Sequence, residues 1–284
     1  MTLDHLLAPD ARLEKVASGF TWVEGPAWIP ARGVLRFSDI PGNRVVEFSE
    51  ADGRTAVISD DAEFTNGRTL ARDGSVIECS HGRRAVQIDR SASEPGADYA
   101  PEILVDRLDP ADGSLTPVVI DVEASNGLAF SPDEGVLYVS DSSLSPAEAD
   151  PPAGRPRGHS IHAYDVIAGR HAKNGRELVE VSPALPDGFR VDVEGNLWSS
   201  SLSGIQVFTP SGEKLGENPV PEKVANCAFG GADGTTLHIC ASTCIYRIHT
   251  RARDAVADRP GCPDLLVRPL GRPAEPPRVR APVN

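Results

Sequence analysis

The sequence predicts an all-β fold built from repeated four-stranded units, and three observations support this prediction. Short runs rich in Val, Ile, Leu and Phe fill the chain, with few amphipathic helical stretches between them. The 26 glycines and 25 prolines are spread among these runs as turn formers and are not pooled in one linker. The runs also recur in sets of similar sequence, which indicates internal repeats.

Each predicted strand is an apolar or β-branched run bounded by turn residues. The predicted strands cover residues 34–40, 44–50, 55–60, 75–81, 136–143, 160–166, 197–202, 204–210, 236–242 and 244–249.

Five segments share an opening loop, a short apolar strand, an acidic-Gly turn and a second strand. They are VEGPAWIPARGVLRFSD, TNGRTLARDGSVIECSH, SNGLAFSPDEGVLYVSD, PDGFRVDVEGNLWSSS and ANCAFGGADGTTLHICAS. Their first polar residues are Glu24, Asn66, Asn126, Asp187 and Asn226, at intervals of 42, 60, 61 and 39 residues. A period near 40 residues with about four strands per repeat is typical of a β-propeller.

The two longer intervals contain extra chain. Residues 85–120 hold strand material without a polar-Gly opening, and residues 144–159 form a Pro/Gly-rich insertion that we expect to be a surface loop. Residues 12–18 could supply the outer strand of the last blade and close the ring. We expect one propeller domain over 1–250 and a Pro/Arg-rich C-terminal extension over 251–284.

Composition excludes several function classes. The net charge is −13, from 41 acidic and 28 basic residues, which disfavours nucleic acid and anionic membranes as partners. No apolar run is long enough for a membrane span and no basic segment precedes an apolar one at the N-terminus, so we expect a cytoplasmic protein. The nucleophile-elbow, dinucleotide-binding and P-loop motifs are absent from the sequence.

The residues that open the repeats are candidates for a shared site. In a propeller the innermost strands line the central channel, so Glu24, Asn66, Asn126, Asp187 and Asn226 should converge at one mouth of the axis. Carboxylate and carboxamide oxygens suit hard cations such as Ca²⁺, Mg²⁺ or Mn²⁺. The competing interpretation is that Asn-Gly and Asp-Gly are only turn formers. Recurrence at one place in the repeat favours metal binding.

The motifs VEGPAWIP, FSDIPGNRV, ASNGLAFSPDEGVLYVSD, LPDGFRVDVEGNLW and ANCAFGGADGTTLHI resemble the senescence marker protein (regucalcin)/gluconolactonase family over most of residues 18–250. That resemblance implies a six-bladed propeller that holds one divalent cation and hydrolyses sugar lactones and related esters. It also implies that Glu24, Asn126 and Asp187 are metal ligands and that Asp187 is the general base.

The chain departs from this family pattern in one respect. Relatives carry a further blade, whose opening Asn contacts metal or substrate, whereas this chain has five repeat openings. Either the propeller closes with five blades, or an incomplete blade from 85–120 fills the sixth position. One family ligand is missing in both cases, and Asn66 or water is its candidate replacement.

Other polar residues near the expected channel mouth complete the candidate set. His81 and Arg84 of CSHGRRAV, together with Asn66, Asp141 and Asn226, are candidate substrate-binding residues or substitute ligands. For His81 the competing interpretation is a structural histidine, and for Asp141 it is a turn at the end of a strand.

The sequence therefore predicts a divalent-metal-dependent lactonase, with the metal as Lewis acid and water as nucleophile. Ca²⁺ is the favoured cation, with Zn²⁺, Mn²⁺ and Mg²⁺ as alternatives, and the partner is a small lactone or ester. The alternative function is a catalytically altered or inactive propeller that binds a small molecule or partner. A third hypothesis is a different reaction in the same pocket.

Overall fold

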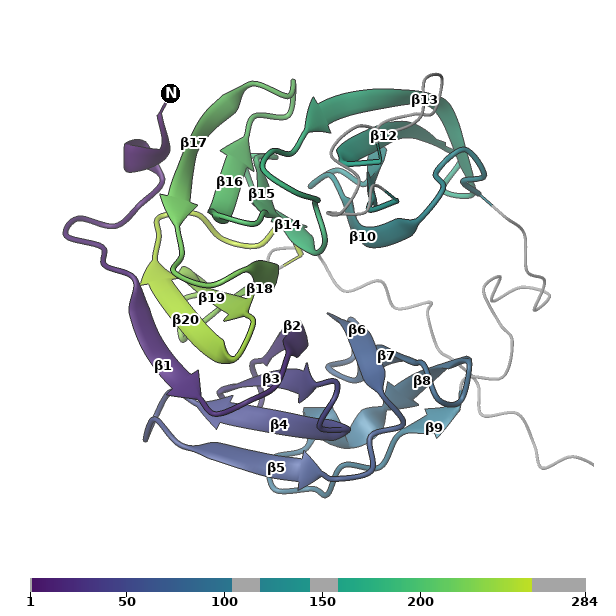
Figure 1. The fold of residues 1–284 in the computed structure, drawn as a ribbon. Helices are drawn as coiled ribbons and strands as arrows, with labels where there is room; N and C mark the ends of the chain where they lie inside the picture. Colours follow the sequence, from purple (N-terminus) through teal and green to yellow (C-terminus); the bar gives the residue numbers. More distant parts are fainter. Residues whose placement is uncertain (1, 104–117, 144–157, 257–284) are drawn as a thin grey trace, which may run out of the picture.

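Five four-stranded antiparallel sheets make up the computed structural model, which describes residues 2–103, 118–143 and 158–256 (Figure 1). The first blade is β2 (Val23–Ile29), β3 (Val34–Asp39), β4 (Arg44–Ser49) and β5 (Thr55–Ser59), and the second is β6 (Thr65–Leu70), β7 (Val76–Ser80), β8 (Ala85–Asp89) and β9 (Glu102–Ile103). The third is β10 (Ser125–Phe130), β11 (Val136–Asp141), β12 (Ser160–Ile167) and β13 (His171–Glu180). The fourth is β14 (Phe189–Val191), β15 (Leu197–Ser200), β16 (Gly204–Phe208) and β17 (Lys214–Pro219).

The fifth blade joins the two ends of the described chain. It contains β18 (Val224–Gly230), β19 (Thr236–Ala241), β20 (Cys244–His249) and the N-terminal β1 (Glu14–Ser18). Strand β1 pairs antiparallel with β20, and Arg247 Nε lies 2.8 Å from Glu14 Oε2 across that pair. The segment 12–18 therefore contributes the outer strand of the last blade.

The β-propeller prediction is confirmed, and each of the ten predicted strands overlaps a strand of the structure. Apart from the strands, the described residues contain two short 3-10 helices, Leu3–His5 and Arg90–Ser93. No described helix has the length and apolar character that a membrane crossing requires.

Part of the extra chain after the second repeat belongs to the second blade. Residues Ala85–Asp89 and Glu102–Ile103 are the two outer strands of the second blade, so they do not form an incomplete sixth blade. The inner strands β6, β2, β18, β14 and β10 are neighbours in that order. Figure 1 shows the second and third blades at the two ends of the resulting arc. Residues 104–117, most of the predicted insertion at 144–159 and most of the extension at 251–284 lie outside the described residues.

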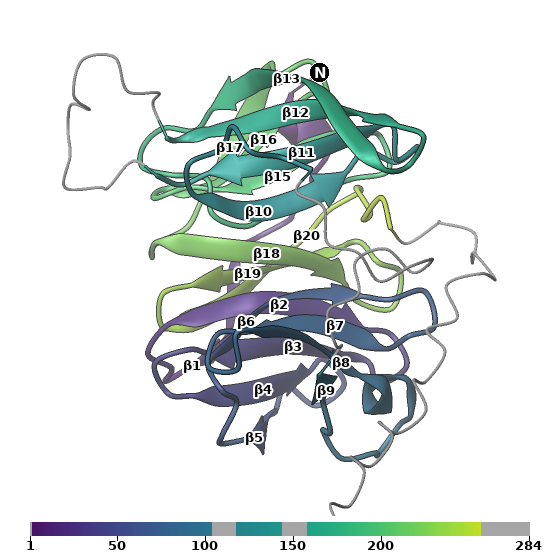
Figure 2. The same cartoon turned by 90° about the vertical axis from the view of Figure 1, so that its right-hand side faces the viewer.

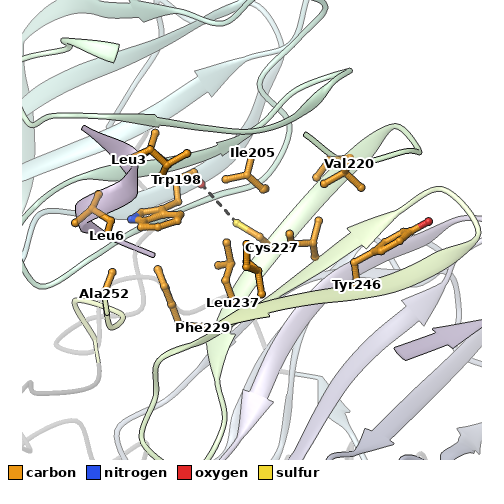
Figure 3. Close-up of a cluster of buried hydrophobic side chains, with 14 of the residues drawn as sticks. Leu3, Leu6, Trp198, Ile205, Val220, Cys227, Phe229, Leu237, Tyr246 and Ala252 are labelled. Atoms are coloured by element: carbon orange, nitrogen blue, oxygen red, sulfur yellow. Dashed lines mark hydrogen bonds between the residues drawn. The ribbon is translucent and has the colours of Figure 1, made fainter. Parts of the chain in front are cut away.

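Neighbouring sheets stack face to face (Figure 2). Buried apolar side chains hold them together. The largest cluster joins the fourth and fifth blades through Trp198, Ile205, Phe229 and Leu237 (Figure 3). The rings of Trp198 and Phe229 meet edge to face, with their centroids 5.5 Å apart. Strand alternation places these side chains on facing sheet surfaces, and burying them provides the main stabilisation of the blade interfaces.

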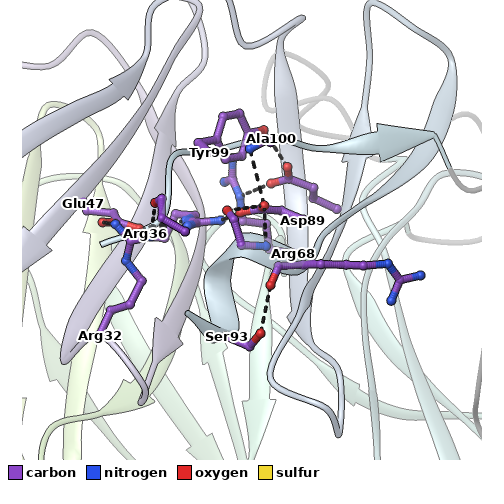
Figure 4. Close-up of polar contacts among 12 residues, drawn as sticks. Arg32, Arg36, Glu47, Arg68, Asp89, Ser93, Tyr99 and Ala100 are labelled. Carbon is purple, nitrogen blue, oxygen red and sulfur yellow. Dashed lines mark hydrogen bonds and ion pairs between the residues drawn. The ribbon is translucent and has the colours of Figure 1, made fainter. Parts of the chain in front are cut away.

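Buried ion pairs join the first and second blades (Figure 4). The fully buried Arg36 of β3 lies 2.9 Å from Glu47 Oε1 and 2.6 Å from Asp89 Oδ2. Arg68 of β6 pairs with Glu78 at 2.7 Å and donates to the carbonyl of Gly25 on β2 at 3.1 Å. Because each buried charge has a partner, these contacts fix the relative position of the inner strands β2 and β6.

The acidic-Gly turns have a specific structural role in the last four blades. In each, an Asp side chain accepts a hydrogen bond from the backbone N–H two residues later, at 3.0 to 3.1 Å. This local bond closes the turn between the two innermost strands. The four residues are Asp73, Asp133, Asp192 and Asp233.

Replacing Asp192 with Ala should lower the free energy of unfolding by about 3 kcal/mol, because several buried donors would lose their acceptor. Asp192 is fully buried and also accepts from Asn196 N at 2.8 Å and from Trp198 Nε1 at 2.9 Å. The matched control is Asp233→Ala, which removes the same turn bond at an exposed position and should cost less than about 1 kcal/mol. Urea unfolding of both variants measures the difference, and equal losses would contradict this account.

Candidate functional site

The repeat openings bring four polar side chains into one connected group. Asn226 Nδ2 donates to Glu24 Oε2 at 3.0 Å. The Glu24 and Asp187 carboxyl groups lie close enough to shift each other's pKa, and the Asn126 side chain lies close enough to lower that of Asp187. Glu24, Asn126 and Asn226 lie on the inner strands β2, β10 and β18, and Asp187 directly precedes β14. Residues from four blades therefore meet where the sequence predicted a channel mouth.

Two glycines permit this close approach. A Cβ atom on Gly188 would lie about 2.0 Å from the Asn226 side chain, so only Gly allows Asn226 to sit beside the Asp187 turn. Gly25 has φ of +56°, and a Cβ there would lie 1.9 Å from the carbonyl oxygen of Asn66. The glycines of the EGP and PDG motifs are thus required by contacts between inner strands.

Serines hold the backbone at Asp187. Ser200 Oγ accepts from the Asp187 N–H at 2.9 Å, and Ser140 Oγ donates to the Asp187 carbonyl at 3.0 Å. Sequence reasoning missed both residues. The sequence does contain a pattern that could have marked them, because a Ser recurs in the second strand of four of the five repeats. Ser38 of the first blade likewise donates to the Thr65 carbonyl of the second.

Burial and mutual repulsion dominate the electrostatics of the two carboxyl groups. Burial, the charge of Glu24 and the hydrogen bond with Glu24 raise the pKa of Asp187 to about 8, although the Asn126 side chain opposes the rise. Burial also raises the pKa of Glu24, against the hydrogen bonds from Asn226 and Gly25 N–H. Two carboxylates in contact are therefore unstable as a doubly ionised pair unless a cation lies beside them.

One fixed cation already lies close to this pair. Arg190 of β14 donates to the carbonyl of Phe189 at 2.8 Å and to that of Pro26 on β2 at 3.0 Å. Its charge acts to lower the pKa of Glu24. Arg190 was not predicted as a site residue, and no repeated pattern in the sequence marks it. It ties together the two strand segments that carry Glu24 and Asp187.

The donor set fits a hard divalent cation. Two carboxylates and two carboxamides offer only oxygen ligands once the amides turn their Oδ1 atoms inward. Among the described residues no group of three or more His, Cys, Asp and Glu side chains is placed to hold a metal, so the fit depends on the two asparagines. The buried Oδ1 of Asn66, whose backbone carbonyl packs against Gly25, has no hydrogen-bond partner in the described part of the chain.

The remaining candidate residues occupy different surroundings. Asn66 and His81 line a cavity of about 330 Å³ together with Ile40 and Phe64. Arg84 lies in the exposed turn between β7 and β8 and is not among the residues that line this cavity. Asp141 is buried and accepts from the backbone N–H groups of Ala124 and Ser143, at 3.3 and 3.0 Å.

Asp141 acts in the same way as its repeat equivalent in the first blade. Asp39 accepts from the backbone N–H groups of Thr21 and Trp22 at 3.0 and 3.1 Å. Both carboxylates hold the loop that leads into an inner strand. This geometry supports the strand-end interpretation of Asp141.

The sequence of this propeller matches a known protein family. A family model described as "SMP-30/Gluconolactonase/LRE-like region" matches residues 22–104 and 95–243, and the chain belongs to this family. The gluconolactonase of Zymomonas mobilis is 29% identical over 88% of this chain and 84% of its own length. The pentonolactonase XacC of Haloferax volcanii is 30% identical over 76% of this chain and 80% of its own length.

A solved structure supports the same conclusion. The gluconolactonase from Xanthomonas campestris has a TM-score of 0.70 and 31% sequence identity, and the match covers 87% of this chain and 92% of that one. Fold, family and relatives together identify the chain as an enzyme of the lactonase class.

Metal-free protein should lose stability as the pH rises from about 4 to about 8. The folded state keeps a proton on Asp187, with a pKa of about 8, that the unfolded chain releases above its ordinary value of 3.8. Asp187→Asn has no such proton, so its free energy of unfolding should fall less between pH 5 and pH 8. Denaturant unfolding in EDTA at both pH values measures the difference between the two proteins. If the free energy of unfolding changed equally in both proteins, the pKa of Asp187 would not be raised as described.

Proposed function

We propose that the chain is a divalent-metal-dependent lactonase that opens a sugar lactone or a similar small lactone or ester, with water as the nucleophile. The observation that carries this proposal is the close approach of the buried carboxyl of Glu24 and the half-buried carboxyl of Asp187, flanked by Asn126 and Asn226, in a chain of a lactonase family. The names of the gluconolactonase and pentonolactonase relatives support a sugar lactone as substrate.

Glu24, Asn126, Asp187 and Asn226 would hold the cation, for which Ca²⁺ is our first choice because all four supply oxygen. When bound, a divalent cation supplies a Lewis acid for the lactone carbonyl and neutralises the paired carboxylates. In the described structure Asn226 is held in place by two contacts. Its Nδ2 donates to Glu24, and its Oδ1 accepts from the Cys227 N–H at 2.9 Å.

Asp187 would act as the general base. Its carboxylate would accept a proton from the water that attacks the lactone carbonyl carbon, and the proton would then pass to the alkoxide leaving group as the ring opens. The backbone of Asp187 is fixed by Ser140 and Ser200, so the carboxyl group is held in position by two strands. Fixed geometry of this kind reduces the reorganisation needed when the substrate reacts.

Asp187→Ala should lower kcat/KM for its best lactone by at least about 100-fold, the usual loss when a general base is removed. A pH-indicator assay would compare D-glucono-δ-lactone, a pentonolactone and simple lactones on EDTA-treated protein before and after addition of Ca²⁺, Mn²⁺, Zn²⁺ or Mg²⁺. We expect activity to return with one cation in the wild type and to stay low in the variant.

Asp233→Ala is the matched control, because it removes an aspartate from the exposed turn between β18 and β19, at the other end of β18 from Asn226. It should retain wild-type activity. Full activity and full metal content in Asp187→Ala would overturn the role of Asp187. Tight metal binding by the wild type without turnover of any lactone would favour the alternative function, a propeller that binds a small molecule without hydrolysis.

A further inference from the structure

A cavity of about 330 Å³ lies beside the candidate site and is not used by the proposed chemistry. Ile40, Phe64, Asn66 and His81 line it, and we name it the Phe64 pocket. Its volume falls in the range of about 300 to 1,000 Å³ that is usual for small-molecule sites. The walls from Ile40 and Phe64 are apolar, and Phe64 leaves 43% of its surface exposed although it is a large aromatic residue.

An unusual backbone conformation presents Phe64 to this pocket. Glu63 and Phe64 have φ of +50° and +51°, in the left-handed region that bulky residues rarely adopt. Two consecutive non-glycine residues in this region cost free energy that the fold must offset elsewhere. Such strain concentrates at binding and catalytic sites, which points to a function for the exposed ring.

Hydrogen bonds from neighbouring turns hold the strained residues. The Asn43 side chain accepts from the Phe64 N–H at 2.8 Å and donates to Asp61 at 3.1 Å, so it bridges the loop on both sides of Glu63. The Glu63 carbonyl accepts from the Gly82 N–H at 2.7 Å. The pocket wall is therefore preformed, because turns of the first and second blades fix it from two sides.

Asn66 connects the pocket to the proposed metal ligands. Asn66 is one of the residues that line the pocket, and its backbone carbonyl packs against Gly25, the residue after Glu24. A substrate whose reacting carbonyl lies at Glu24 and Asp187 could therefore extend a substituent past Asn66 into the pocket. Hydroxyl groups would lose water against Ile40 and Phe64 and would find partners only on the side of Asn66 and His81, whereas an alkyl group would gain from burial against the apolar walls.

We propose that the Phe64 pocket binds an alkyl substituent on the ring of the lactone, so that alkyl-substituted lactones are preferred over polyhydroxylated ones. This inference rests on the proposed lactonase function and narrows its substrate class. Phe64 is then a residue that determines specificity and takes no part in proton transfer.

The test compares three lactones with the same six-membered ring: δ-valerolactone without a substituent, δ-nonalactone with a butyl group, and D-glucono-δ-lactone with hydroxyl groups. Phe64→Ala should lower kcat/KM for δ-nonalactone by about tenfold and leave that for δ-valerolactone within about twofold. The matched control is Val57→Ala, which truncates another exposed apolar residue, on the outer strand β5, and should change neither value.

A binding measurement separates failure of this inference from failure of the lactonase proposal. The probe is 6-butylpiperidin-2-one, the lactam that corresponds to δ-nonalactone, observed by saturation-transfer NMR with wild type, Phe64→Ala and Val57→Ala. Butyl-group saturation that is lost only in Phe64→Ala supports the pocket, even if no lactone is hydrolysed. Equal saturation in all three proteins, or faster hydrolysis of D-glucono-δ-lactone than of δ-nonalactone, overturns the inference.

Discussion

The contact between the carboxyl groups of Glu24 and Asp187 is the constraint on which the rest of the site depends. These residues come from the first and fourth blades, and burial together with mutual repulsion makes their joint ionisation unfavourable. In the proposed function a divalent cation binds this pair, and the ion would convert the repulsion into attraction. In the proposed site the two asparagines beside the pair would add neutral oxygen ligands without adding further negative charge.

The surrounding structure resists this repulsion through many fixed contacts. Arg190 bridges the strand segments behind both carboxyl groups, and Ser140 and Ser200 hold the backbone of Asp187 from two directions. Next to Glu24, Arg68 donates to the backbone carbonyl of Gly25 and pairs with Glu78, so this part of β2 is tied to the second blade. The apolar interfaces between sheets supply most of the stability that these polar contacts depend on.

Much of the fold could be predicted because each repeat carries its own local signals. Alternating apolar residues gave the strands, and the acidic-Gly turns could be recognised because an Asp closes its own turn through a short-range bond. The shared position of Glu24, Asn66, Asn126, Asp187 and Asn226 in their repeats predicted that all five converge. Four of them form one connected group in the structure, whereas Asn66 lines the neighbouring cavity. Strand period and turn chemistry are local properties, so a single sequence reports them well.

The features that sequence reasoning missed depend on contacts between distant segments. The bridge from Arg190 to Pro26 joins two blades, and no periodic pattern marks it. The left-handed conformation of Glu63 and Phe64 depends on Asn43 and Gly82, which belong to neighbouring turns. The role of residues 85–120 was ambiguous because outer strands lack the polar-Gly opening. Pairing of β8 with β7, and of β9 with β8, assigns Ala85–Asp89 and Glu102–Ile103 to the second blade.

The central claim is that Glu24, Asn126, Asp187 and Asn226 form one cation site, and anomalous X-ray diffraction tests it most directly. Crystals of the full chain grown with Mn²⁺, which can occupy hard oxygen sites, would be measured at a wavelength where manganese scatters anomalously. The account predicts a single strong peak among the oxygen atoms of these four side chains. A strong peak at other residues, with the Glu24–Asp187 pair still in direct contact, would contradict it.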